Sequence, residues 1–160
     1  MKSKYQVGEL KLPKGIIERF ENNTWQKPSS FDKLEQLVLE KNPFEPEAEN
    51  LKKEIKDFGL YKLELIHSET KYLKEWEDTD EHIMFLGKKD PINSPGCILP
   101  EKTLFFADFG IGSDTPFALD YSENLMEPCV LLIYWGENPE VDNRWIKIAN
   151  SFQEFEKAVW

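Results

Sequence analysis

Four strand-like segments separated by turn-forming clusters occupy the second half of the chain, and they limit the folds that it can adopt. Apolar, β-branched and aromatic residues dominate each segment, whereas Gly, Asn, Asp and Pro gather between them. The segments are residues 103–107, 116–120, 129–135 and 144–148. Because short turns connect them, we predict that successive strands pair antiparallel in a meander.

Apolar residues at helical spacing predict helices before and after this meander in the sequence. These helices cover residues 16–20, 31–38, 51–58, 68–76 and 152–159. Ser29 with Asp32 resembles a capping box at the start of the second helix. Ser151 with Glu154 forms the same motif at the start of the last helix.

Two more strands are expected before the meander. Residues 60–66 alternate apolar and polar side chains with a period of two, and residues 82–86 form a second short strand-like run. Helices first, strands next and a helix last predict an α+β fold. We expect a mostly antiparallel sheet with helices packed on one face and the C-terminal helix last.

Size and composition predict a single domain over residues 1–160. A chain of 160 residues with 40% hydrophobic and 13% aromatic side chains can bury a core of its own. No run approaches the roughly 18 apolar residues that cross a bilayer, and the first residues contain no apolar signal segment. We therefore expect no membrane partner and a cytoplasmic location.

The net charge and the spacing of Cys and His narrow the possible chemistry. A net charge of -10 disfavours direct binding to nucleic acid and favours encounter with a basic protein. Cys97 and Cys129 lack a CxxC partner, and His67 and His82 have no metal ligand at the usual spacing. We expect no metal, no cofactor and no catalytic residue.

Residues 107–114 read ADFGIGSD and contain the DFG triplet of protein kinases. The residues before Asp108 contain no glycine-rich loop, strand lysine or HRD motif, so a kinase is excluded. Gly110 and Gly112 permit the positive φ angles of a tight turn, and Ser113 and Asp114 can bond the backbone of that turn.

The sequence leaves three interpretations of this glycine turn. It is a hairpin connection without a ligand, a rim that recognises a protein, or a metal or phosphate site. The carboxylates of Asp108, Asp114 and Asp120 do not follow the EF-hand spacing, which disfavours calcium. The third glycine of a dinucleotide motif and the lysine of a P-loop are also missing, which disfavours phosphate.

Several motifs that follow one another in order resemble the SUKH superfamily. They lie at residues 107–114, 117–121, 130–135, 143–149 and 151–155. The resemblance is closest over residues 103–159 and looser before them. That superfamily includes the yeast regulators of cell-wall synthesis and many bacterial immunity proteins.

The resemblance implies a non-catalytic binding protein rather than an enzyme. The leading expectation is an immunity protein that neutralises a cognate polymorphic toxin, often a nuclease, by direct binding. The alternative is a regulatory scaffold for cell-wall or polysaccharide synthesis. A small-ligand-binding domain or an enzyme is the third possibility.

An acidic and aromatic surface is expected to contact the protein partner. The residues expected on it are Asp108, Asp114, Asp120, Tyr121, Glu123 and Trp135. We expect a structural role in the motif for Gly110, Gly112, Ser113 and Trp145. Because Trp135 and Trp145 lie in predicted strands, each is either a core residue or part of a groove for the partner.

Overall fold

A six-stranded antiparallel sheet forms the centre of the molecule. The computed structural model describes residues 3–24, 28–42, 45–75, 84–89, 95–109, 115–138 and 142–160. The strand order is β3-β5-β6-β7-β8-β4. The strands are β3 (Gly59–Leu60), β4 (Pro95–Gly96), β5 (Thr103–Asp108), β6 (Phe117–Asp120), β7 (Cys129–Tyr134) and β8 (Arg144–Ala149). The predicted antiparallel meander is therefore confirmed as β5 to β8.

A separate hairpin and several helices surround this sheet. The hairpin consists of β1 (Gln6–Val7) and β2 (Leu10–Lys11). The helices are α1 (Lys14–Glu21), α2 (Phe31–Lys41), α3 (Glu45–Glu54), α4 (Leu63–Glu75) and α7 (Phe152–Val159), with 3-10 turns η1 (Ile55–Asp57) and η2 (Pro100–Lys102). The α+β class with a C-terminal helix last is confirmed.

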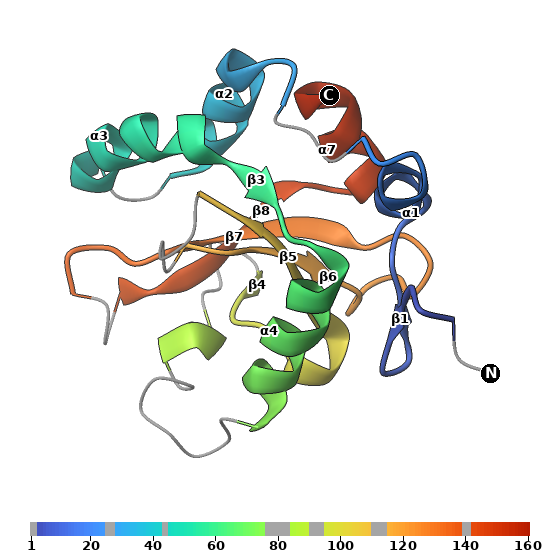
Figure 1. The fold of residues 1–160 in the computed structure, drawn as a ribbon. Coiled ribbons are helices and arrows are strands. Elements are labelled where there is room, and N and C mark those ends of the chain that lie inside the picture. Colours follow the sequence, from blue (N-terminus) through green and yellow to red (C-terminus); the bar gives the residue numbers. More distant parts are fainter. Residues whose placement is uncertain are drawn as a thin grey trace.

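The helices are distributed unequally over the two faces of the sheet. Figure 1 shows α2, α3 and α7 on one face, with α1 beside α7, and α4 on the opposite face. The expectation of helices on one face holds for the first four. Because α4 covers the other side, β5 is buried on both faces, and Phe105 and Phe106 are both buried.

Aromatic rings fill the core on both sides of β5. On the side of α7, Phe117 contacts Phe58 edge-on with a centroid distance of 5.0 Å, and Phe155 packs against both rings. On the opposite side, Phe105 stacks on the fully buried Trp145 at 5.5 Å. The indole N–H of Trp145 donates to the carbonyl of Phe85 at 2.6 Å, so its one polar atom is satisfied.

The prediction of a strand at residues 60–66 is wrong for most of that segment. Only Leu60 lies in a strand, and α4 begins at Leu63. The alternation of two leucines with charged residues was too short to distinguish a strand from a helix. The longer pattern decides, because α4 buries Ile66, Thr70 and Leu73 at helical spacing, while Leu65 is 37% exposed.

The strand expected at residues 82–86 is also wrong where the structure describes it. Residues 84–86 are helical, and residues 82 and 83 lie outside the described residues. Gly87, with φ of 77°, closes this turn by donating its backbone N–H to the carbonyl of Met84. The side-chain amide of Asn143 donates to the same carbonyl. By accepting hydrogen bonds from Gly87 and Asn143, the Met84 carbonyl holds this segment in a turn.

Serine caps start two of the helices. Ser30, rather than Ser29, caps α2 by accepting the backbone N–H of Lys33 at 3.4 Å. Ser151 caps α7 as predicted, accepting the backbone N–H of Glu154 at 3.0 Å. The Glu154 carboxylate reaches back to the N–H of Asn150, one residue before the cap. Both helices therefore begin where a hydroxyl satisfies a free backbone donor.

The segment predicted as a helix at 51–58 begins earlier and ends differently. The helix α3 starts at Glu45, and the 3-10 turn η1 follows it. Leu51, Ile55 and Phe58 are buried, so the apolar spacing identified the inward face even though the helix type changes. Among the described helices, none combines the length and apolarity that crossing a bilayer requires.

Candidate functional site

The described residues among those expected to contact a partner lie at two opposite ends of the sheet. Asp120 pairs with Thr103 at one end of the β5–β6 hairpin, and Asp108 ends β5 at the other. Five residue steps along β5 separate the two positions, which is about 16 Å. Tyr121 and Glu123 follow Asp120, whereas Trp135 lies at the Asp108 end. The structure therefore does not bring these residues into one patch.

The glycine turn between β5 and β6 lies outside the described residues. The turn contains Gly110, Gly112, Ser113 and Asp114, which were expected to act in the motif or the contact. At the edge of this turn, Asp108 is half-buried and faces Glu69 of α4, where burial and then the charge of Asp108 raise the pKa of the Glu69 carboxyl. Two neighbouring carboxylates at this end of the sheet thus repel each other when both are ionised.

Trp135 packs on protein rather than standing free. It is half-buried, and its ring meets that of Phe85 edge-on at a centroid distance of 5.1 Å. Phe85 in turn supplies the carbonyl that binds the Trp145 indole. Both tryptophans therefore hold residues 84–86 against the sheet.

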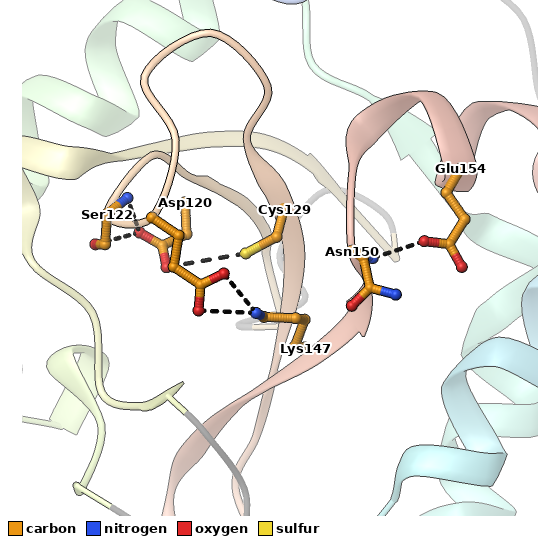
Figure 2. A network of polar contacts seen from close by, with 7 residues as sticks. Asp120, Ser122, Cys129, Lys147, Asn150 and Glu154 are labelled. Atoms are coloured by element: carbon orange, nitrogen blue, oxygen red, sulfur yellow. Dashed lines mark hydrogen bonds and ion pairs between the residues drawn. The ribbon is translucent and has the colours of Figure 1, made fainter.

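Asp120 is buried and bonded within the chain. Its side chain accepts the backbone N–H of Ser122 at 3.0 Å and the hydroxyl of Ser122 at 2.6 Å. The Cys129 thiol approaches its other oxygen at 3.9 Å, and Figure 2 shows Asp120 between these two residues. With only 6% of its surface exposed, Asp120 holds the chain where β6 ends and the next loop begins.

The environment of Cys129 keeps its thiol protonated. Burial, and then the charge of Asp120, raise the pKa of this thiol to about 12. Cysteine reactivity depends on the thiolate, which this pKa removes at neutral pH. Cys129 is therefore a structural hydrogen-bond donor rather than a nucleophile.

Tyr121 anchors the start of the same loop to the N-terminal hairpin. Its ring is 1% exposed, and its hydroxyl donates to the carbonyl of Lys11 at 2.6 Å. Burial and then the charge of Glu127 raise the pKa of this phenol, so it stays a donor. Tyr121 connects β2 to the loop between β6 and β7, which spans residues 121–128 and is called the 121–128 loop below.

An ion pair ties the middle of the 121–128 loop to β8. The Lys147 ammonium lies 3.0 Å from both carboxylate oxygens of Glu123. Dashed lines at Lys147 in Figure 2 mark these two contacts. Burial opposes the charge of Lys147, but the hydrogen bond to Glu123 and the neighbouring carboxylates outweigh it and raise its pKa. The Glu123 side chain itself is 70% exposed and forms part of the surface.

Further hydrogen bonds fix the tip of the loop. The side-chain oxygen of Asn124 accepts the backbone N–H groups of Met126 at 2.9 Å and Glu127 at 3.2 Å. This is the turn geometry that Asn side chains favour. The Pro128 carbonyl accepts the backbone N–H of Phe152 at 2.9 Å, which joins the end of the loop to α7.

Two large apolar side chains stand on this bonded loop. Met126 is 85% exposed and Leu125 is 57% exposed, the highest values among the large hydrophobic residues of the described chain. Glu123 and Glu127 flank them in sequence. The expected contact residues did not include Leu125 or Met126. The available signal was an apolar pair inside a short acidic segment between two strands.

The surface at this end of the sheet has features that suit binding. Across the described ranges, no group of three His, Cys, Asp or Glu side chains is arranged to hold a metal ion. The loop instead offers an apolar tip with a carboxylate on each side, on a backbone held by its own side chains. Apolar centres with polar surroundings are the usual anatomy of protein interfaces.

Comparison with known proteins identifies the family. The model of the SMI1 / KNR4 family (SUKH-1) matches residues 31–157, which includes the whole meander and α7 up to Lys157. Searches of curated proteins and of solved structures found no match. The match extends well beyond half of the chain, so the chain belongs to the SMI1 / KNR4 family, SUKH-1.

Proposed function

We propose that this protein is an immunity protein that neutralises a cognate toxin by binding it with the 121–128 loop. The family includes immunity proteins and cell-wall regulators and is generally non-catalytic. In this proposal the protein acts in the cytoplasm and blocks the toxin by covering its active site or substrate channel. No reaction by the immunity protein itself is required.

The exposure of Met126 on a fixed backbone carries the proposal. Burying an exposed methionine and leucine in a partner removes apolar surface from water, which favours association by about 25 cal/mol per Å². Since the loop is already held by Asn124 and by the Glu123–Lys147 pair, little backbone ordering is needed on binding. Methionine is one of the residue types enriched at protein interfaces.

The charge of the molecule suits a basic toxin such as a nuclease. The net charge of -10 attracts a cationic partner and speeds encounter, an effect that salt screens. Glu123 and Glu127 place two of these charges beside the apolar tip. We assign Asp120 and Tyr121 to holding the loop, and we do not include Asp108 and Trp135 in the contact because they lie at the opposite end.

Co-expression with a candidate toxin found in the gene neighbourhood tests the proposal. The wild-type protein should protect the cell and bind the purified toxin. Met126→Asp should weaken binding at least about 30-fold, which corresponds to the roughly 2 kcal/mol of a hot-spot residue. Tyr72→Asp is the matched control, because Tyr72 is a large exposed side chain, 49% accessible, on α4 and outside the 121–128 loop.

Two outcomes would contradict the proposal. One is a toxin that kills equally well with and without the protein. The other is equal toxin binding by the wild type and Met126→Asp, with circular dichroism showing that both are folded. A protein that fails to protect and instead binds wall-synthesis enzymes would support the alternative role, a regulatory scaffold for cell-wall or polysaccharide synthesis.

A further inference from the structure

A groove separates the N-terminal hairpin from α4, on a part of the surface that the toxin contact does not use. It has a volume of about 940 Å³, within the range of about 300–1,000 Å³ that small-molecule sites occupy. We call it the hairpin groove. Its lining is mostly apolar and is formed by Lys4, Val7 and Gly8 on one side and by Leu63, Glu64, His67, Ser68, Thr70, Lys71, Lys74 and Glu75 on the other.

The two walls of the groove meet at both ends, which keeps the space between them open. The ring Nε2 of His67 lies 3.0 Å from the carbonyl oxygen of Lys4. At the other end, Gly8 lies so close to Lys74 that a Cβ added there would be 3.2 Å from the ammonium nitrogen. His67 and Lys74 are seven residues apart on α4, or roughly 10 Å along the helix axis.

The backbone of the hairpin helps to hold the hairpin in place as one wall of the groove. Gly8 has φ of 62°, in the left-handed region that the tight β1–β2 turn requires. The Tyr121 hydroxyl, bonded to Lys11, ties the hairpin to the sheet. The hairpin wall is therefore attached at the helix and at the sheet.

Thr70 lines the groove and has a buried hydroxyl without a hydrogen bond in the described part of the chain. The residue is only 1% exposed. His67, Thr70 and Lys74 recur at i, i+3 and i+7, so all three lie on the face of α4 that looks toward the hairpin. An unpaired buried hydroxyl is unfavourable, and a ligand oxygen would satisfy it.

The groove carries a local charge opposite to that of the molecule. Three lysines and two glutamates line it, and Lys71 pairs with Glu75 at 3.4 Å. The remaining charged lining residues are Lys4, Lys74 and Glu64, an excess of one positive charge in a chain with a net charge of -10. A single negative charge on the ligand matches this excess, whereas the several charges of a phosphate ester do not.

We propose that the hairpin groove binds a small amphipathic carboxylate, a molecule with an apolar body and one carboxylate group. The apolar body packs against Val7, Leu63 and the methylene stems of the lysines, which bury readily against apolar surfaces. The carboxylate binds at Lys74 and Thr70, which are neighbours at i and i+4 on the helix. This site is independent of the proposed toxin contact.

Titration of the ¹⁵N-labelled protein with sodium octanoate tests the site. Octanoate should shift the amide resonances of α4 and the β1–β2 hairpin and reach saturation, whereas octan-1-ol and inorganic phosphate should bind at least about tenfold more weakly. Lys74→Met keeps the stem but removes the charge, so it should weaken octanoate binding by about tenfold, the value of one charge-assisted hydrogen bond. Lys53→Met, an exposed lysine in the last turn of α3, is the matched control.

A second variant separates ligand binding from folding. Thr70→Val removes only the hydroxyl, and since that hydroxyl has no partner, the free protein should be no less stable. Octanoate binding should nevertheless weaken severalfold. Met126→Asp should bind octanoate as the wild type does, so that failure here is distinguishable from failure of the toxin proposal.

Three results would overturn the site. They are shifts that spread over the surface without saturating, octan-1-ol binding as tightly as octanoate, and Lys74→Met binding octanoate as tightly as the wild type. Each would show that the carboxylate is not recognised by the groove.

Discussion

Single side chains at the two ends of β5 and β6 illustrate how position changes the behaviour of a carboxylate. Asp120 is buried but satisfied, because Ser122 and Cys129 donate to it. Glu69 is half-buried and faces another acid, Asp108, so burial and then repulsion raise its pKa above the ordinary value of 4.5. Buried carboxylates are tolerated where hydrogen-bond donors surround them and are costly where such donors are absent.

Replacing Glu69 should therefore stabilise the protein at neutral pH. The folded state holds the Glu69 proton to a higher pH than the unfolded chain, so stability falls as the pH rises above about 4.5 through the folded pKa. We expect Glu69→Gln to raise the free energy of unfolding at pH 7 by less than about 1 kcal/mol, a discounted figure for a half-exposed group. The gain should disappear below pH 4, where both states are protonated.

Urea unfolding at pH 7 and pH 4 measures this difference. Glu101→Gln, an exposed acid on η2, serves as the control and should change little at either pH. A Glu69→Gln variant that is less stable than the wild type at pH 7 would mean that the carboxylate makes a favourable contact instead.

At the scale of elements, the ends of helices are as important as their apolar faces. α7 carries Phe152 and Phe155 into the aromatic core, and its first turn is capped by Ser151. The hydroxyl of Ser29 reaches the last carbonyl of the chain, Trp160, at 2.9 Å, so the start of α2 and the end of α7 are tied together. A weakened cap on α7 would therefore also loosen the packing between α7 and α2.

The two serine caps should differ in strength. Ser151 accepts its backbone donor at 3.0 Å and Ser30 at 3.4 Å. Since the shorter bond is the better one, Ser151→Ala should lower the free energy of unfolding by about 1 kcal/mol and Ser30→Ala by less. Urea unfolding of both variants tests the order. Equal losses, or a larger loss for Ser30→Ala, would contradict it.

At the scale of the whole molecule, helices on both faces share one central sheet. Phe106 and Phe105, adjacent in β5, point to opposite sides and contact Phe155 and Trp145. A disturbance on one side of this strand is transmitted to the other through the same backbone. We therefore propose that residues 1–160 unfold as one domain.

Phe117→Ala tests this cooperativity. Loss of a fully buried ring that touches Phe58, Phe106 and Phe155 should cost about 3–5 kcal/mol. Tryptophan fluorescence and far-UV circular dichroism should report the same lowered urea midpoint, because no part of the sheet unfolds alone. Two separated midpoints would instead show independent units.

The amino-acid sequence by itself determined the meander from β5 to β8, the C-terminal helix and the family. The strands and the helix depend on neighbours within a few residues: runs of apolar, β-branched and aromatic residues, turn formers between them and a serine cap. The family follows from the order of these motifs along the chain. The spacing of Leu51, Ile55 and Phe58 likewise identified a buried face. Local sequence patterns of this kind can be identified before any long-range contact is known.

Only the tertiary structure decided which residues reach the surface. It buried Tyr121, whose partner Lys11 is 110 residues away in sequence, and Asp120, which contacts Cys129 of the neighbouring strand, and it left Met126 exposed. It also made residues 63–66 part of α4, because helix packing on β5 outweighs a short alternating pattern. Burial depends on contacts between distant segments, so the binding surface followed from the fold rather than from the motifs.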